Sequence, residues 1–151
     1  MDGALPERQR RAVNLRLNAE VWDLAKRAYV TTWLHPELSS MTKWIDCAAR
    51  THAARSPAER AGDAAWLPRL DPSVPSVPKV FRLRPQVVEA IDNAVAADVI
   101  VRGVKTSRSA WLTEAIRLGI LNTDRAYNGL DEVGPTMQLP RYPVGRALGL
   151  W

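Results

Sequence analysis

The sequence predicts a mainly helical fold built around a two-stranded antiparallel β-ribbon. The first observation is a repeat, because the pattern Ser-x-(Ser/Thr)-x-Trp-(Ile/Leu)-x-x-Ala-(Ala/Ile)-Arg begins at Ser40 and again, 67 positions later, at Ser107. The second is a pair of short matching segments upstream of it, Leu15-Arg16-Leu17 and Phe81-Arg82-Leu83, which lie 66 positions apart. A duplicated unit of strand, helix, loop and helix, with one residue inserted in its loop, accounts for both observations.

Alternating polarity predicts one strand in each unit. In the first unit Val13, Leu15 and Leu17 share one side, whereas Ala12, Asn14 and Arg16 share the other. In the second unit Phe81 and Leu83 point inward, and Val80 and Arg82 point outward. Each strand has only about five residues, and so short a strand needs a partner for its backbone hydrogen-bonding groups. We therefore expect the two strands to pair with each other.

Capping residues and apolar spacing predict two helices in each unit. Asn18 caps a first helix whose apolar residues recur at helical spacing, and Pro36 ends that segment. Ser39 or Ser40 caps the next helix. In the second unit Pro85 suits a first helical turn, Gly103 stops the helix, and Ser107 caps the last long one.

Composition divides the chain into five segments. We expect a flexible polar arm at 1–11, the two repeated units at 12–55 and 79–121, a proline-rich linker at 56–78, and a tail at 122–151. Ser56-Pro57-Ala58-Glu59 is a capping box that predicts one short helix in the linker. The tail contains a predicted short helix near Thr123 to Val133 and then a proline-broken apolar stretch, which packs on the domain or binds a partner.

The positive charge lies in the repeated units. The chain carries a net charge of +5, and residues 1 to 55 hold 9 basic and 6 acidic side chains, whereas 78 to 121 hold 7 and 4. Such a distribution favours a polyanionic partner, with a general arginine-rich bias as the alternative.

Several classes of protein are disfavoured. A single cysteine, Cys47, excludes an internal disulfide and a cysteine-cluster metal site. His35 and His52 have no ligand partner at metal spacing, and the chain contains no glycine-rich phosphate loop or catalytic constellation. We expect no catalysis, no metal and no cofactor. Without a signal peptide or an apolar run of membrane-spanning length, the expected location is the cytoplasm, with no membrane partner.

Residues 13–54 and 79–121 resemble the ribbon-helix-helix family of bacterial DNA-binding proteins, with the closest similarity between Val13 and Leu24, where the chain is similar to Arc-type repressors. The resemblance implies that two units intertwine and lay a two-stranded ribbon in the major groove of double-stranded DNA. Here one chain would supply both units as an internal pseudo-dimer.

Family members act as plasmid partition (centromere-binding) proteins, repressors, antitoxins and relaxosome factors. The tract from Ala53 to Ala61 is similar to plasmid partition proteins, which places partition first and predicts association with a plasmid or the nucleoid.

The outward strand residues are the predicted base contacts. Arg16 and Arg82 can each pair with guanine O6 and N7, Asn14 can pair with adenine N6 and N7, and Val80 offers an apolar contact, such as to a thymine methyl. The two halves would then recognise different sequences. The alternative is that the arginines are solvated charges that protect a strand edge from aggregation.

The two helix N-termini after the strands are the predicted phosphate contacts. Free N–H groups and a partial positive charge hold an anion well at such a position. The residues concerned are Ser40, Met41, Thr42 and Lys43 in the first unit, and Lys105, Ser107, Arg108 and Ser109 in the second. Capping without phosphate binding remains open for both serines. Trp44 and Trp111, which lie among apolar neighbours, are predicted core residues.

The termini suggest further partners. In partition families an arginine-bearing arm stimulates a Walker-type ATPase, and Arg8, Arg10 and Arg11 are the candidates here, although the same arginines could instead bind DNA phosphates. The alternative function is an antitoxin or other interaction protein whose tail binds a protein, with DNA binding for autoregulation. Multimerisation on DNA is left open.

Overall fold

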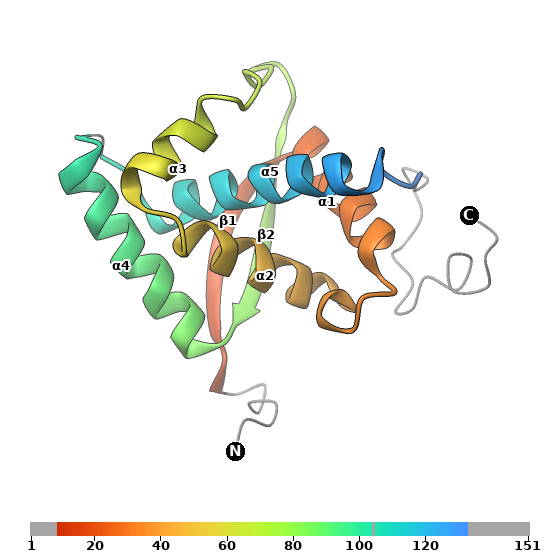
Figure 1. The fold of residues 1–151 in the computed structure, drawn as a ribbon, viewed down its shortest axis with the longest axis horizontal. Coiled ribbons are helices and arrows are strands. Elements are labelled where there is room, and N and C mark those ends of the chain that lie inside the picture. Colours follow the sequence, from red (N-terminus) through yellow and green to blue (C-terminus); the bar gives the residue numbers. More distant parts are fainter. Residues whose placement is uncertain (1–8, 104, 133–151) are drawn as a thin grey trace.

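The computed structural model describes residues 9–103 and 105–132, and these form a mainly helical fold with a two-stranded antiparallel ribbon and five α-helices (Figure 1). The elements in chain order are β1 (Arg11–Asn18), α1 (Ala19–Thr32), the 3-10 helix η2 (Pro36–Leu38), α2 (Met41–Ala53), α3 (Pro57–Ala64), β2 (Ser76–Leu83), α4 (Pro85–Val101) and α5 (Arg108–Tyr127). None of the helices in the described ranges is long and apolar enough to cross a bilayer.

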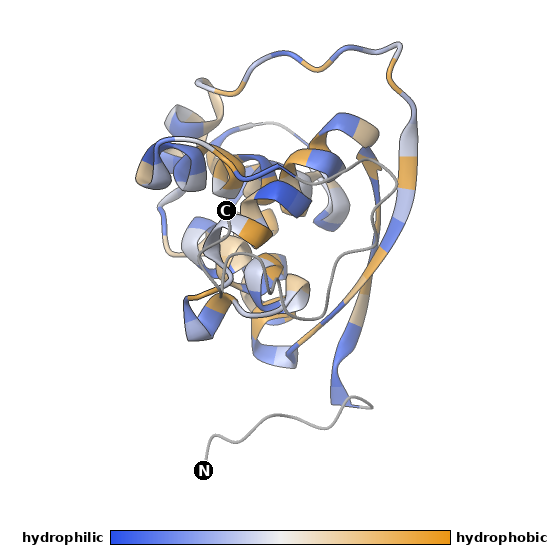
Figure 2. Ribbon diagram, turned by 90° about the vertical axis from the view of Figure 1, so that its right-hand side faces the viewer, coloured by the Kyte–Doolittle hydropathy of each residue, from blue (hydrophilic) through white to orange (hydrophobic). Residues whose placement is uncertain are grey.

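The ribbon is formed within one chain. β1 pairs antiparallel with β2, so that Arg11 lies opposite Leu83 and Asn18 opposite Ser76. Figure 2 shows the two strands along one edge of the molecule, with the helices on one side of them and apolar and polar residues alternating along their length. The inward residues Leu15, Leu17 and Leu83 are almost fully buried against the helices. The predicted pairing of the two strands is confirmed.

Each strand is longer than the sequence indicated. Both have eight residues rather than about five, so Arg11 belongs to β1 and not to an arm, and β2 begins at Ser76, inside the expected linker. Pro78 is accommodated because each strand of a two-stranded ribbon is an edge strand, on which a missing N–H need not break a hydrogen bond. The opposite strand supplies partners that the local sequence does not reveal.

The predicted caps are present. Asn18 Oδ1 accepts hydrogen bonds from the backbone N–H groups of Glu20 and Val21, which starts α1 immediately after β1. Gly103 adopts a φ of +67° just after α4, a conformation that favours glycine.

Towards the C-terminus, α5 continues without a break to Tyr127, so a separate helix starting near Thr123 does not form. Val133 lies outside the described residues.

The helices of one repeat pack mainly on those of the other. α1 packs mostly against α5, α2 packs against α4 and α5, and α5 also contacts β1 while α2 contacts β2. Trp22 of α1 lies 6.2 Å from the ring of Phe81 on β2. Figure 1 shows α2 and α5 crossing between α1 and α4. The two repeats therefore share one core, in which Trp44 and Trp111 are 3% and 1% exposed, as expected.

The linker helix is fixed by a buried ion pair. Ser56 and Glu59 form the predicted capping box. Beyond it, Arg60 Nη2 lies 2.7 Å from Asp98 Oδ1 on α4, and these side chains are 3% and 1% exposed. The Arg60 guanidinium also donates to the carbonyl groups of His52, Ala53 and Arg55 at the end of α2. One arginine thus joins the linker, α2 and α4.

A second group of contacts continues this buried network. Asp98 Oδ2 accepts from Trp111 Nε1 at 3.2 Å, and Arg102 bridges Asp98 and Glu114. Glu114 Oε2 lies 2.7 Å from His52 Nε2. Burial raises the pKa of Glu114, but the hydrogen bonds from His52 and Arg102 outweigh it, so this pKa lies below its usual value.

Arg60→Ala should destabilise the protein by about 3–5 kcal/mol, because it leaves a buried carboxylate without its main partner. Urea unfolding followed by tryptophan fluorescence measures the change. Arg69→Ala, an exposed arginine in the same linker, is the matched control and should leave the unfolding midpoint nearly unchanged. Equal, small effects of both substitutions would contradict the structural role of Arg60.

Candidate nucleic-acid interface

The outward side of the ribbon is exposed as the sequence predicts. We call this surface the outer face, and its six residues are all exposed: Ala12, Asn14 and Arg16 on β1, and Pro78, Val80 and Arg82 on β2. Val80 remains 56% exposed although it is apolar. Neither strand contains an acidic residue. Besides Ala12 and Pro78, the outer face therefore presents two arginines, one amide and one branched apolar side chain on two paired strands.

The pairing register sets the order of these side chains. Asn14 lies opposite Val80 in the middle of the ribbon, Arg16 opposite Pro78, and Arg82 opposite Ala12. The two arginines consequently flank the central pair, one on each side. Arg16 Nη2 donates to the carbonyl oxygen of Ser76 at 3.2 Å. Arg82 makes no ion pair or hydrogen bond within the described part of the chain.

Both predicted helix N-termini have the expected caps. Ser40 Oγ accepts from the N–H of Lys43, and Ser107 Oγ accepts from the N–H of Ala110, each at 3.1 Å. The N–H groups of the first helical residues lack an acceptor within their own helix. They belong to Met41 and Thr42 in α2 and to Arg108 and Ser109 in α5.

A direct contact joins one of these N-termini to the ribbon. Ser109 Oγ donates to the backbone carbonyl of Asn14 at 2.7 Å. The first turn of α5 therefore begins beside the centre of β1, close to the outer face. This contact fixes the backbone that carries Asn14 while its side chain stays exposed.

The three predicted phosphate-binding cations are placed differently. Lys105 is exposed and has no ion pair or hydrogen bond among the described residues. Lys43 Nζ donates to Pro36 O and Ser39 Oγ in the preceding turn. Arg108 forms a two-point ion pair with Asp92, at 2.8 and 2.7 Å, and its hydrogen bond is the main reason that the pKa of Asp92 lies below its usual value.

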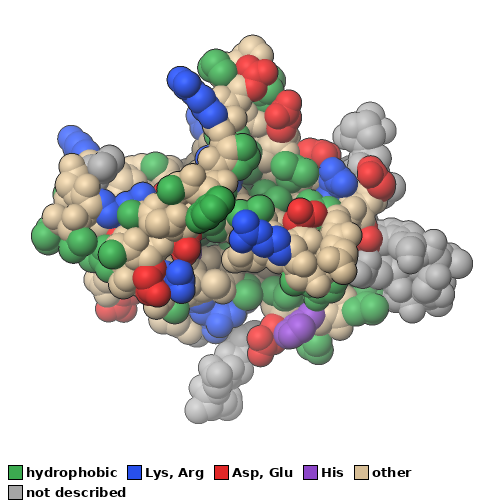
Figure 3. Space-filling model, turned by 45° about the horizontal axis from the view of Figure 1, so that its top comes forward, with side chains coloured by type: hydrophobic (Ala, Val, Ile, Leu, Met, Phe, Trp, Pro, Cys, Tyr) green, Lys and Arg blue, Asp and Glu red, His purple; other side chains and the backbone are tan. Residues whose placement is uncertain are grey.

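Basic residues away from the ribbon are mixed with other side chains on the face that Figure 3 draws. Acidic and apolar side chains are interspersed with them there. Many arginines are engaged internally: Arg84 and Arg50 both contact Asp46, and Arg55 contacts Asp63. Those charges are compensated within the fold, so they should attract a polyanion less than the arginines of the ribbon do. The net charge does not reveal this difference.

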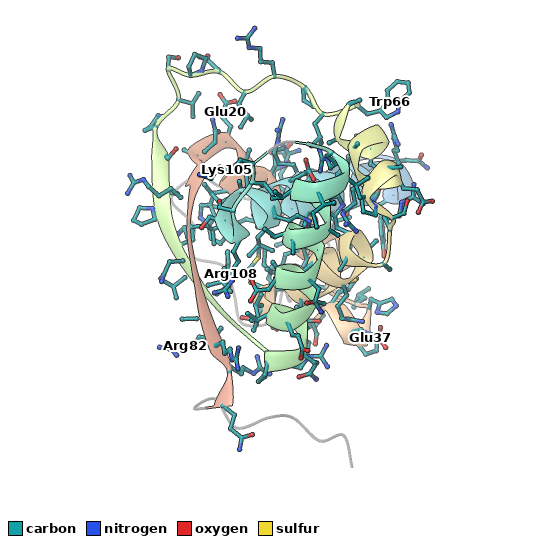
Figure 4. All side chains as sticks on the ribbon, turned by 90° about the vertical axis from the view of Figure 1, so that its left-hand side faces the viewer. Glu20, Glu37, Trp66, Arg82, Lys105 and Arg108 are labelled. Atoms are coloured by element: carbon teal, nitrogen blue, oxygen red, sulfur yellow. The ribbon has the colours of Figure 1, made fainter. Side chains whose placement is uncertain are left out.

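A groove lies on another part of the molecule and was not foreseen from the sequence. It has a volume of about 450 Å³ between α2, α3 and α5, with Ala48, Ala115 and Gly119 among its lining residues. A Cβ at Gly119 would lie 3.1 Å from Ala48 Cβ, so the two helices approach closely there. Trp66, which is 76% exposed, also lines it. Figure 4 shows Trp66 on the opposite side of the helices from the ribbon, whereas Arg82 lies at the ribbon.

The described residues contain no cluster that could hold a metal ion. His52 is buried and bonded to Glu114, and His35 Nδ1 accepts from the N–H of Glu37, so the two histidines serve local structure. Of the arginines proposed for the N-terminal arm, Arg8 lies outside the described residues, Arg10 is half-buried, and Arg11 is in β1. The apolar tail beyond Glu132 is likewise outside the described range.

Comparisons with protein-family models, with curated proteins and with solved structures gave no significant match to this chain. The geometry of the outer face and its flanking helices is therefore the basis for inferring a function.

If duplex DNA binds at the start of α5, as the sequence predicts, Asp92→Asn should increase the affinity for DNA of any sequence, because it releases the Arg108 guanidinium there. One additional phosphate contact should steepen the dependence of log affinity on log salt by about 0.9. Titrations of random-sequence DNA at several salt concentrations measure this slope. Glu89→Gln removes the same charge from an exposed position of the same helix, and equal effects of both substitutions would show that Arg108 gains no contact.

Proposed function

We propose that this protein binds double-stranded DNA in a sequence-specific manner, with its ribbon in the major groove. The observation that carries the proposal is the outer face, on which Arg16 and Arg82 flank Asn14 and Val80 with no acidic side chain in either strand. The major groove is about 12 Å wide and admits a two-stranded ribbon, whose strands lie about 5 Å apart. Arginine and asparagine are the side chains that pair in two-point fashion with guanine and adenine.

The helix N-termini support the same function. Ser109, in the first turn of α5, is hydrogen-bonded to the backbone at the centre of β1. A ribbon that enters the major groove of DNA therefore brings this turn towards the DNA backbone. Backbone N–H groups at a helix start bind phosphate well, and such contacts position a protein without specifying a sequence. Lys105 is the cation best placed by exposure to add to them.

We further propose that one chain acts as an intramolecular pseudo-dimer of ribbon-helix-helix units. The support is the pairing of β1 with β2 inside one chain and the packing of each repeat's helices on those of the other. The linker contributes to this arrangement through Arg60, which joins α3 to α2 and α4.

For the biological role we favour a plasmid partition protein that binds a centromere-like site, or an autoregulatory repressor. Iterated short sites beside its own gene would favour partition, whereas a single promoter site would favour a repressor. The groove between α2, α3 and α5 is the observation that favours the other candidate, a protein such as an antitoxin that binds a protein partner and uses DNA binding for autoregulation.

Light scattering at micromolar concentration should give the mass of one 151-residue chain, since the ribbon is completed inside the chain and needs no second copy. Weak association at higher concentration is compatible with this expectation. A tight dimer that does not dissociate at micromolar concentration would contradict the pseudo-dimer.

Alanine substitution should separate the two classes of contact. Arg16→Ala or Arg82→Ala should cost about 1–3 kcal/mol on the cognate site and little on random DNA, whereas Lys105→Ala should weaken both and reduce the salt slope by about one. Fluorescence anisotropy on cognate and random duplexes measures these effects. Arg125→Ala, at the groove rather than the ribbon, is the control that should change neither. Equal losses on both duplexes for Arg16→Ala would overturn its assignment to base recognition.

A further inference from the structure

The register of the ribbon relates the two repeats by an approximate two-fold axis. Asn14 lies opposite Val80, and these residues are also equivalent in the repeat, because they are 66 positions apart. The same holds outward from the centre: Arg16 lies opposite Pro78, the equivalent of Ala12, and Arg82 lies opposite Ala12 itself. The axis therefore passes through the pair of Asn14 and Val80.

This axis divides the outer face into symmetric and asymmetric parts. Arg16 and Arg82 are equivalent residues, each two positions from the axis, or about 7 Å along its strand at 3.3 Å per residue. At the axis the two equivalent positions differ, since one carries an amide and the other an isopropyl group. Ala12 and Pro78, the remaining equivalent pair of the outer face, also differ, but neither side chain can form a hydrogen bond. The difference in hydrogen-bonding groups therefore lies at the axis, where a symmetric dimer would have two identical side chains close together.

We propose that the protein binds its DNA site in a single orientation, determined by the difference between Asn14 and Val80. This inference rests on the proposed DNA-binding function and specifies the class of site. The outer parts of the site should be palindromic, with a guanine for Arg16 and a guanine for Arg82. The centre should not be palindromic: Asn14 needs an adenine with free N6 and N7 groups, whereas Val80 offers no hydrogen bond and favours a thymine methyl.

Both central side chains are free to make these contacts. Asn14 and Val80 are exposed, and neither side chain has a hydrogen bond or ion pair within the described residues. The backbone under Asn14 is held by Ser109, so the amide is presented from a fixed position. Substitutions at these two sites remove no buried group and should leave the fold intact.

Selection from random duplexes provides the first test. The sites enriched by the protein should have inverted guanines in their outer arms and an unsymmetrical centre. Val80→Asn makes the central pair symmetric and should instead select a fully palindromic site. Asn14→Val should weaken binding to the selected site by roughly 5- to 150-fold, the range for losing one two-point base contact. A symmetric centre selected by the unmodified protein would overturn the inference.

Directed cleavage provides the second test. In a Cys47→Ser background, Ser76→Cys places a thiol at one end of the ribbon, where a tethered iron chelate can cut nearby DNA. Cleavage should fall in one arm of the selected site, and Val80→Asn should give cleavage in both arms. The double substitution Asn14→Val with Val80→Asn should move cleavage to the other arm at nearly unchanged affinity.

The outcomes separate this inference from the function on which it rests. If the unmodified protein cleaves both arms equally, or if the double substitution leaves cleavage in the original arm, the central pair does not set orientation although the protein binds DNA. If no duplex is enriched and none is bound above the affinity for random sequence, the proposed function itself fails.

Discussion

The pairing of β1 with β2 is the interaction on which the rest of the structure depends. Neither strand could persist alone, because a lone strand leaves its N–H and C=O groups without partners. Once paired, the ribbon turns Leu15, Leu17, Phe81 and Leu83 towards the helices, and this apolar side is the surface on which α1, α2 and α5 are assembled. The same pairing forces the polar side outward, so the outer face is a direct consequence of how the core is made.

The two repeats differ where the linker attaches. The repeat places Trp44 and Trp111 at equivalent positions, yet Trp44 packs over the bare backbone of Gly119, whereas Trp111 lies 4.8 Å from the ring of His52 and donates to Asp98. Asp98 in turn binds Arg60. A linker that must return the chain from α2 to β2 has thus acquired a buried ion pair on one side of an approximately symmetric fold. The ribbon register is unaffected by this asymmetry.

Local signals were sufficient for much of the fold and for the outer face. The alternation around Leu15, the cap at Asn18 and the capping box at Ser56 depend on neighbouring residues, and each was predictable. The strand lengths and the partners of Arg60 and Arg108 depend on residues more than a dozen positions away. Asp98 offered one clue, since Val87, Ile91 and Ala94 put it on the buried side of α4, where a carboxylate requires a cation. The sequence did not indicate which cation.

Several arginines form ion pairs within the fold, so the basic composition overstates how many cations are available to bind a polyanion. Four arginines in or at the ends of helices, namely Arg50, Arg84, Arg102 and Arg108, are held by Asp46, Asp92, Asp98 or Glu114. Each held guanidinium would have to exchange a protein carboxylate for a phosphate before it could bind DNA. Arg82 and Lys105 face no such exchange among the described residues. Affinity for a polyanion should therefore arise from a few uncompensated charges on and beside the ribbon rather than from the net charge. Because Arg16 and Arg82 lie on the paired strands, which the helices of both repeats contact, electrostatic attraction and base recognition by these two residues would act through the same ribbon.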